Sequence, residues 1–312
     1  MEQSTRETYG KTLVELGRQN PDIVVLDADL SKSTMTSFFA KEFPRRFFDC
    51  GIAEQNMMGI AGGLAASGKT VFASTFAVFA PGRCFDQIRM SIAQPGLNVK
   101  IVTTHGGITV GEDGTSHHAV EDLALICSLP SFTVIVPADA TEVTQAVKVA
   151  AQSYGPFYIR LSRPKTPLVY APDYKFTLGK AVTLREGKDI TVIATGLMVA
   201  PALGAAQSLA LDGIDCRVLS MSTLKPLDRD AIVKAAMETG AIVTAEEHLR
   251  RGGLGSAVAQ IASEQWPVPM SFIAINDIYA KSGKAEELLK RHRLTAADIE
   301  SAARSLILKK RA

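Results

Sequence analysis

The sequence has little of what marks a secreted, zinc-bound or membrane-embedded protein. Its four cysteines, Cys50, Cys84, Cys127 and Cys216, stand far apart in 312 residues. None forms a CxxC pair, so neither a zinc knuckle nor a thioredoxin-type redox site is indicated. The N-terminus lacks the basic and then apolar pattern of a signal peptide, and no apolar run approaches the roughly 18 residues of a membrane helix. We therefore expect a cytoplasmic protein without a membrane partner.

A marked excess of one charge is also absent. Lys and Arg number 34 and Asp and Glu 32, which gives a formal net charge of +2. Nucleic-acid-binding proteins usually carry a basic excess or stripe, so we expect no nucleic-acid partner. Apolar residues make up 46% of the chain and charged residues 21%, which is an ordinary globular composition. A prior of roughly 150 residues per domain suggests two domains.

Short apolar runs alternate with stretches of helical spacing along the chain. The runs are apolar throughout rather than alternating, which predicts strands covered on both faces. Strand–helix–strand repeats form right-handed parallel βαβ units. A proline-rich stretch without periodicity, residues 164–176, divides two such series. We therefore predict an α/β protein with two doubly wound domains, residues 1–165 and 177–312. The predicted strands are Ile23–Leu26, Val99–Thr103, Phe132–Val136, Phe157–Leu161, Ile190–Ala194, Cys216–Leu219, Ala241–Thr244 and Phe272–Ile275, and the predicted helices include Glu54–Ala66, Ala119–Leu129, Ala140–Ala151 and Leu197–Leu211.

The densest group of polar residues lies in residues 103–118, directly after a predicted strand. The segment holds three of the five histidines, four glycines, Glu112 and Asp113. Ligands bind at the carboxyl ends of parallel strands, so this position favours a site over a plain surface loop. A metal site is less favoured, because the adjacent His117 and His118 point in different directions and no HExxH spacing is present.

Glu54 begins a predicted helix that is almost wholly apolar. An acid in the first turn complements the helix dipole by about 0.3–1 kcal/mol, which would be a purely structural role. However, so apolar a helix should be buried, and burying a carboxylate without a partner is costly. Glu54 therefore needs a partner or a function, and proton exchange with a ligand nitrogen suits a buried carboxyl group.

Other segments offer candidate contacts with alternatives. Phe76 and Phe79 lie in an apolar stretch where simple core packing is the stronger interpretation. Arg163 ends a predicted strand, where it could bind an anion bidentately or be solvated. Ser33 follows another strand and could stand at a helix start, where backbone N–H groups favour phosphate.

Together these segments resemble the C-terminal half of transketolase as a separate polypeptide. Gly51-Ile-Ala-Glu-Gln-Asn is similar to the family's glutamate-bearing helix, and Val110-Gly-Glu-Asp-Gly-Thr-Ser-His to its GEDGPTHQ-type segment. The resemblance extends over nearly the whole chain and implies a pyrimidine-binding domain followed by a transketolase C-terminal domain. Further matching segments are Val136-Pro-Ala-Asp, Leu161-Ser-Arg, and Glu246-Glu-His with Gly252-Gly-Leu-Gly-Ser.

The resemblance implies a thiamine diphosphate-dependent enzyme that moves a two-carbon ketol unit from a ketose phosphate to an aldose. By it, Glu54 binds the aminopyrimidine ring and His117 transfers protons at the reacting carbonyl. Phe76 and Phe79 hold the pyrimidine, and Asp29 lies near the cofactor. The residues implied for the sugar phosphate are Ser33, His105, Asp113 and Arg163.

The chain also departs from the family pattern. Thr115, Ser116 and His118 stand in the segment where the family has proline before its Thr-His-Gln tail. Gly82 occupies an aromatic position three residues after Phe79. These departures leave ketol transfer plausible and the sugar preference open, and the Glu246–His248 cluster could be structural.

The segment that binds the diphosphate in this superfamily is missing. It consists of Gly-Asp-Gly and a downstream Asn that completes a Mg²⁺ site, and none of Asn20, Asn56, Asn98 and Asn276 is placed to complete one. Oxygen ligands in octahedral array suit Mg²⁺, and this chain offers no such set. We therefore expect no metal ligands here. An N-terminal transketolase subunit would hold Mg²⁺ or another divalent ion and share thiamine diphosphate with this chain, in an α2β2 heterotetramer.

Two other interpretations stay open. The beta subunit of a 2-oxo acid dehydrogenase has the same two domains, although residues 111–117 and 161–163 favour transketolase. A non-catalytic subunit that only stabilises a partner is the second, and the joint presence of Glu54, His105 and His117 argues against it. A 1-deoxyxylulose-5-phosphate synthase is weaker, because that enzyme is normally one long chain.

Overall fold

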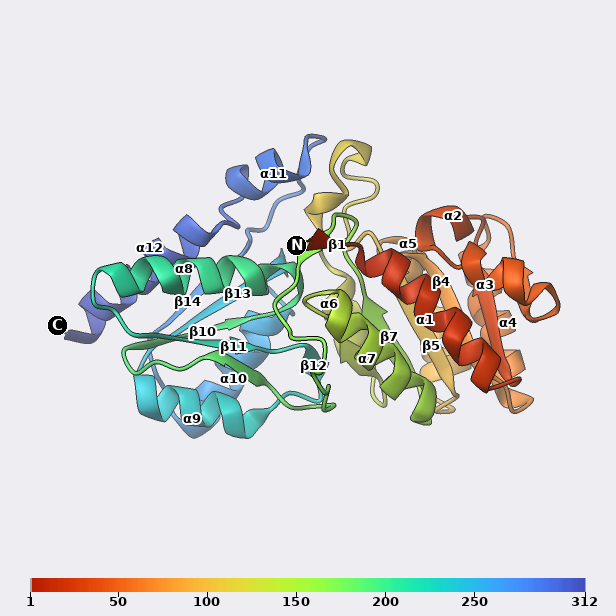
Figure 1. The fold of residues 1–312 in the computed structure, drawn as a ribbon, viewed down its shortest axis with the longest axis horizontal. Helices are drawn as coiled ribbons and strands as arrows, with labels where there is room; N and C mark the ends of the chain where they lie inside the picture. Colours follow the sequence, from red (N-terminus) through yellow and green to blue (C-terminus); the bar gives the residue numbers. More distant parts are fainter. Residues whose placement is uncertain (1, 312) are drawn as a thin grey trace.

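Two mostly parallel sheets organise the computed structural model, which describes residues 2–311 (Figure 1). The seven-stranded sheet with its helices is called the first lobe, and the five-stranded sheet with its helices the second lobe. The lobes lie side by side, and the N-terminal strand lies between them (Figure 1). The expected α/β class with doubly wound sheets is confirmed. In the described part of the chain, no helix is both long and apolar enough to cross a membrane.

The first lobe has helices on both faces of its sheet. Along β2, Ile23 and Val25 pack with α1 and α7, whereas Val24 and Leu26 pack with α4 and α5. This alternation explains why the strands are apolar throughout. The strand order is β12 (Thr223–Lys225), β6 (Thr133–Ile135), β7 (Phe157–Arg160), β5 (Val99–Thr104), β4 (Thr70–Phe76), β2 (Ile23–Asp27) and β3 (Phe47–Asp49), and the helices are α1 (Thr5–Gln19), α2 (Ser31–Thr34), α3 (Ser37–Glu42), α4 (Glu54–Ala66), α5 (Phe79–Ile88), α6 (Asp122–Cys127) and α7 (Ala140–Gln152).

The second lobe repeats this plan on a smaller scale. Helices α8 and α12 cover one face of its sheet, and α9 and α10 cover the other. Only β9 runs antiparallel to its neighbour. The strand order is β14 (Met270–Ile275), β13 (Ile242–Leu249), β10 (Ile190–Ala194), β11 (Cys216–Ser220) and β9 (Val182–Arg185), and the helices are α8 (Val199–Leu211), α9 (Arg229–Thr239), α10 (Leu254–Gln265), α11 (Ala285–Arg291) and α12 (Ala296–Arg311).

The helix α4 has the predicted bounds but not the predicted burial. Its inner face, with Met57 and Met58, is buried, whereas Ile52 before it is 78% exposed and Ile60 within it 37%. A Cβ added at Gly59 or Gly63 would meet no atom within 4 Å. The expectation of a fully buried helix is therefore wrong for the outer face, which stays largely exposed among the described residues.

The predicted helix over Ala119–Leu129 is shorter in the structure. It extends only over α6, Asp122–Cys127. Before it, the backbone of residues 107 and 119 forms an isolated antiparallel bridge, and the Leu249 N–H donates to the Val120 carbonyl at 2.9 Å. These long-range backbone contacts replace the first helical turn, and local spacing gives no sign of them.

The proline-rich stretch between the two series of strands is packed rather than free. Its β8 (Thr166–Pro167) pairs with the N-terminal β1 (Glu2–Gln3). The Asp139 carboxylate accepts the backbone N–H groups of Val169 and Tyr170 at 2.7 and 2.9 Å. The stretch therefore runs along the first lobe before it enters the second.

One strand crosses between the lobes. Although β12 follows β11 in the chain, it pairs antiparallel with β6 at the edge of the first sheet (Figure 1). Its Leu224 is 5% exposed and belongs to the apolar core between that sheet and α4. Three residues from the expected second domain thus complete the first lobe.

This crossing predicts that truncating Leu224 destabilises the first lobe. Leu224→Ala removes a buried side chain from a close-packed core, so we expect the free energy of unfolding to fall by about 2–5 kcal/mol. Leu211, which is 89% exposed at the end of α8, provides the control. Leu211→Ala should change stability by less than about 0.5 kcal/mol. Urea unfolding followed by circular dichroism measures both, and equal effects of the two variants would contradict the prediction.

Candidate active site

Aromatic and histidine side chains gather at the carboxyl ends of β4 and β5. The Phe76 ring stacks on His105 with centroids 3.8 Å apart and lies nearly parallel to Phe79 at 5.9 Å. The His117 ring meets the Phe79 ring edge-on at 5.3 Å. Four predicted site residues, Phe76, Phe79, His105 and His117, are therefore in one cluster, where an α/β sheet binds its ligands.

His105 is held neutral by its surroundings. The residue is buried, has a left-handed backbone with φ 61°, and its Nδ1 lies 2.8 Å from the Thr104 hydroxyl. Burial, with further contributions from the charges of Arg6 and Arg163, lowers the pKa of His105 to about 3. The imidazole can therefore make neutral hydrogen bonds to a ligand but carries no charge at physiological pH.

Glu54 has a charged partner, Arg83, which the sequence analysis did not identify. Its side chain is 2% exposed, and its Oε2 lies 3.2 Å from Arg83 Nη1. The Arg83 guanidinium also lies 4.2 Å from the centroid of the Phe79 ring, a cation–π distance. Since Phe79 and Arg83 both belong to α5, that helix brings the carboxylate next to the aromatic cluster.

The loop after β2 carries Asp29 and Ser33. Asp29 is exposed with φ 61°, and its N–H donates to the Asp49 carboxylate at 3.0 Å. Beneath it, the buried Asp27 accepts from the Leu30 N–H and from two threonine hydroxyls, and burial raises the pKa of Asp27 to about 6. The Ser33 N–H already donates to the Leu30 carbonyl at 2.7 Å. A bound anion would therefore meet the Ser33 hydroxyl rather than this N–H.

Arg6 belongs to the same region, although the sequence reasoning missed it. Its Nη1 donates to the Ser33 carbonyl at 2.6 Å. Burial and the nearby positive charge of Arg163 lower its pKa, and its own charge lowers that of His105. The sequence gives no signal for this, because Arg6 stands in the first turn of α1 and meets these residues only in the fold.

The remaining loop residues differ in their placement. Asp113 and Arg163 are exposed, and Arg163 Nη1 donates to the Val110 carbonyl. His118, in contrast, is buried, and its Nε2 lies 3.2 Å from the Gly111 carbonyl oxygen. Two of the three loop histidines therefore line the cluster, and the third packs beneath the loop.

The residues fit one half of thiamine diphosphate. A buried carboxylate beside two phenylalanine rings suits an aminopyrimidine, which offers ring nitrogens and a flat apolar face. Within residues 2–311, no group of three or more His, Cys, Asp or Glu side chains is arranged to hold a metal ion. The described residues thus offer contacts for the pyrimidine ring.

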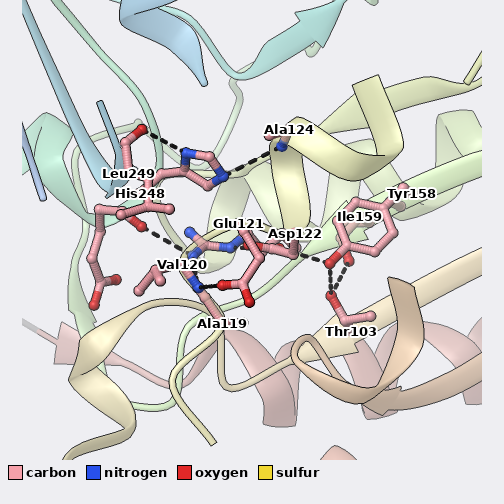
Figure 2. A network of polar contacts seen from close by, with 12 residues as sticks. Thr103, Ala119, Val120, Glu121, Asp122, Ala124, Tyr158, Ile159, His248 and Leu249 are labelled. Atoms are coloured by element: carbon pink, nitrogen blue, oxygen red, sulfur yellow. Dashed lines mark hydrogen bonds and ion pairs between the residues drawn. The ribbon is translucent and has the colours of Figure 1, made fainter. Parts of the chain in front are cut away.

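Behind the cluster, the Glu246–His248 segment joins the two lobes. Figure 2 shows His248, whose Nε2 accepts the Ala124 N–H at 3.3 Å and whose Nδ1 lies 2.8 Å from the Leu249 carbonyl oxygen. Glu246 accepts the N–H groups of Leu254 and Gly255 at the start of α10. The Glu247 carboxylate accepts the Thr109 N–H at 2.6 Å. Burial raises the pKa of both glutamates to about 7. Each of the three side chains thus bonds to nearby backbone groups.

Two doubly wound lobes, with a cluster of aromatic and histidine side chains at the carboxyl edge of the first sheet, define a two-domain α/β protein. Comparison with known proteins is more specific. The transketolase pyrimidine-binding domain model matches residues 1–169, and the transketolase C-terminal domain model matches residues 179–299. The chain belongs to the transketolase family, whose members generally use thiamine diphosphate and a divalent metal ion.

Relatives of similar length occur among both sequences and structures. A putative transketolase C-terminal section from Methanocaldococcus jannaschii is 48% identical over 297 residues, 94% of this chain and 93% of that protein. A 6-deoxy-6-sulfo-D-fructose transketolase subunit from Clostridium sp. strain MSTE9 is 42% identical over 305 residues, 98% of this chain and 95% of that protein. A solved split-gene transketolase, described as an inactive beta4 tetramer, is 54% identical with a TM-score of 0.92 over 98% of both chains.

The environment of His105 predicts that its ring does not titrate between about pH 5 and pH 9. Since its pKa is about 3, the neutral form prevails over this whole range. In ¹⁵N-labelled protein, the His105 ring nitrogens should keep constant chemical shifts, and the His105→Gln spectrum assigns them. A titration midpoint above about pH 5 contradicts the prediction.

Proposed function

We propose that this chain is the C-terminal, beta-type subunit of a two-subunit, thiamine diphosphate-dependent transketolase. The enzyme transfers a two-carbon ketol unit from a ketose phosphate to an aldose acceptor. The observation that carries the proposal is the buried Glu54 paired with Arg83, whose guanidinium lies over the Phe79 ring that His117 meets edge-on. Family membership and full-length similarity to C-terminal sections support it.

Each residue of the cluster has a role in this reaction. When bound, thiamine diphosphate supplies the nucleophilic carbon and the electron sink. Glu54 binds the aminopyrimidine and holds a proton at its ring nitrogen, while Phe76 and Phe79 pack on the ring. His117 moves a proton at the oxygen of the substrate carbonyl. Asp29 lies at the same sheet edge, on the loop after β2, and contacts the cofactor from there.

A few charged and polar side chains, rather than a general positive field, would bind the terminal anion of the sugar. Arg6 and Arg163 provide the positive charge, and the neutral His105 and the Ser33 hydroxyl provide hydrogen bonds. Charge-assisted bonds of this kind contribute roughly 1.5–3 kcal/mol each. Asp113, on the loop that carries His117, contacts a sugar hydroxyl. A phosphate or a sulfonate suits this set, and a relative is named for a sulfosugar.

The missing half of the site implies a partner. We propose that an N-terminal subunit binds the divalent ion and the diphosphate, shares thiamine diphosphate with this chain, and assembles with it as an α2β2 heterotetramer. The exposed outer face of α4 with Ile52 lies next to Glu54 and provides an apolar contact surface. The solved relative described as an inactive beta4 tetramer supports activity only with a partner. Residues 1–165 and 177–312 serve as the pyrimidine-binding and C-terminal domains.

The test is reconstitution with the N-terminal subunit and an assay of ketol transfer from xylulose 5-phosphate. Glu54→Gln keeps the size of the side chain but removes its acidity, so kcat should fall by roughly 10²- to 10⁴-fold. The matched control is Glu287→Gln on the exposed face of α11, which should leave kcat unchanged. The proposal fails if Glu54→Gln is as active as the control, or if this chain alone binds the cofactor tightly and turns over ketose phosphates.

A further inference from the structure

The segment that carries His117 is rich in glycines with positive φ. Residues 107–118, called the catalytic loop from here on, contain Gly107, Gly111 and Gly114 with φ values of 82°, 85° and 76°. Glycine reaches this left-handed region without strain but also has the most conformational freedom to lose. A loop with three such residues needs outside contacts to keep one shape.

The second lobe supplies these contacts. The segment between β14 and α11 lies against the catalytic loop, and α11 stands beside that loop (Figure 1). A Cβ added at Gly114 would lie 2.3 Å from Ser282 Oγ, and one at Gly111 would lie 3.2 Å from the Gly283 carbonyl oxygen. The Thr115 hydroxyl donates to the Ala280 carbonyl at 2.6 Å. The loop backbone thus packs directly on residues 280–283.

His118 makes a second connection at the same place. Its ring is 2% exposed, with Nε2 3.2 Å from the Gly111 carbonyl oxygen. Its Nδ1 is also buried and makes no hydrogen bond with normal geometry to residues 2–311. Burial lowers the pKa of His118. A neutral imidazole has one N–H, and the Gly111 carbonyl is the hydrogen-bond partner of the ring among the described residues.

We propose that Thr115 and His118 are positioning residues: Thr115 ties the catalytic loop to the Ala280 carbonyl, His118 ties the loop to itself at the Gly111 carbonyl, and together they hold His117 edge-on to Phe79. The inference rests on the proposed function and deepens it, because it gives the C-terminal domain a part in catalysis. Both residues stand where this chain departs from the GEDGPTHQ pattern. The proline of that pattern has no hydroxyl to donate, so this tie depends on the residues of this particular chain.

The variants are chosen to separate hydrogen bonding from packing. Thr115→Val keeps the side-chain shape and removes the donor, and His118→Phe keeps a buried ring and removes its N–H. His118→Gln keeps an amide N–H donor for the Gly111 carbonyl. Thr183→Val, on the exposed side of the edge strand β9, is the matched control for a threonine hydroxyl.

Steady-state kinetics of the reconstituted complex give the first measurement. We expect Thr115→Val to lower kcat by roughly 2- to 10-fold, the equivalent of one neutral hydrogen bond. His118→Phe should lower it by more than about 10-fold, since a small misplacement of a reacting group is costly. The KM for the ketose should change by less than about 2-fold, and His118→Gln should regain most of the kcat lost in His118→Phe.

Amide hydrogen exchange of the catalytic loop gives a measurement that does not depend on activity. Loop amides should exchange faster in Thr115→Val and His118→Phe and at the native rate in Thr183→Val. Unchanged kcat and unchanged loop exchange in both variants would overturn the inference. The inference would also be overturned if His118→Gln failed to restore kcat and amide exchange rose uniformly over the whole chain. A native complex without ketol transfer refutes the proposed function instead, and the exchange data still decide whether the tie exists.

Discussion

One buried guanidinium group donates hydrogen bonds to both lobes and links them. Arg160, at the end of β7, pairs with Asp122 at 2.9 Å and donates to the carbonyls of Ala119 in the first lobe and Glu247 in the second. Figure 2 shows the polar network that surrounds it, in which Tyr158 donates to Asp122 at 2.7 Å and Thr103 to Tyr158 at 3.1 Å. A buried charge is tolerated only when it is paired and hydrogen-bonded in this way. Because its acceptors come from both lobes, Arg160 keeps its partners only in the docked arrangement.

The position of Arg160 also affects whether the carboxyl edge of the second sheet can bind a ligand. In open α/β sheets, ligands bind near the point where the strand order reverses. In the second sheet, that point lies between β10 and β13, and Arg160 and Glu247 line it together with Gly196. The remaining cavity there is about 10 Å³, which leaves no room for a ligand. Contacts that dock the two lobes therefore fill the carboxyl edge of the second sheet.

The features predicted correctly from the sequence are those that depend on neighbouring residues. The apolar runs placed most of the strands, and α4 begins and ends where its spacing indicates, because both features depend on neighbouring residues. The features that the sequence could not show rest on contacts between distant residues. Arg6 reaches Ser33 across 27 positions, Thr115 reaches Ala280 across 165, and the three residues of β12 join a sheet that their own sequence does not specify. The same limit applies to α4, whose outer face lacks a partner within this chain.

Charge at the candidate site is arranged by burial rather than by the number of basic residues. With a net charge of +2, the chain has no strong overall field to attract an anion. Arg6 and Arg163 lie close enough for each charge to affect its neighbours, and with burial they keep His105 uncharged. A neutral imidazole between two guanidinium groups avoids a third like charge and still provides a hydrogen bond. Glu54 is arranged on the same principle, because Arg83 already balances the carboxylate in the single chain. Because Arg83 pairs with Glu54 and burial keeps His105 neutral, both side chains are already held in place in the single chain, and such preorganisation saves binding energy for the reaction.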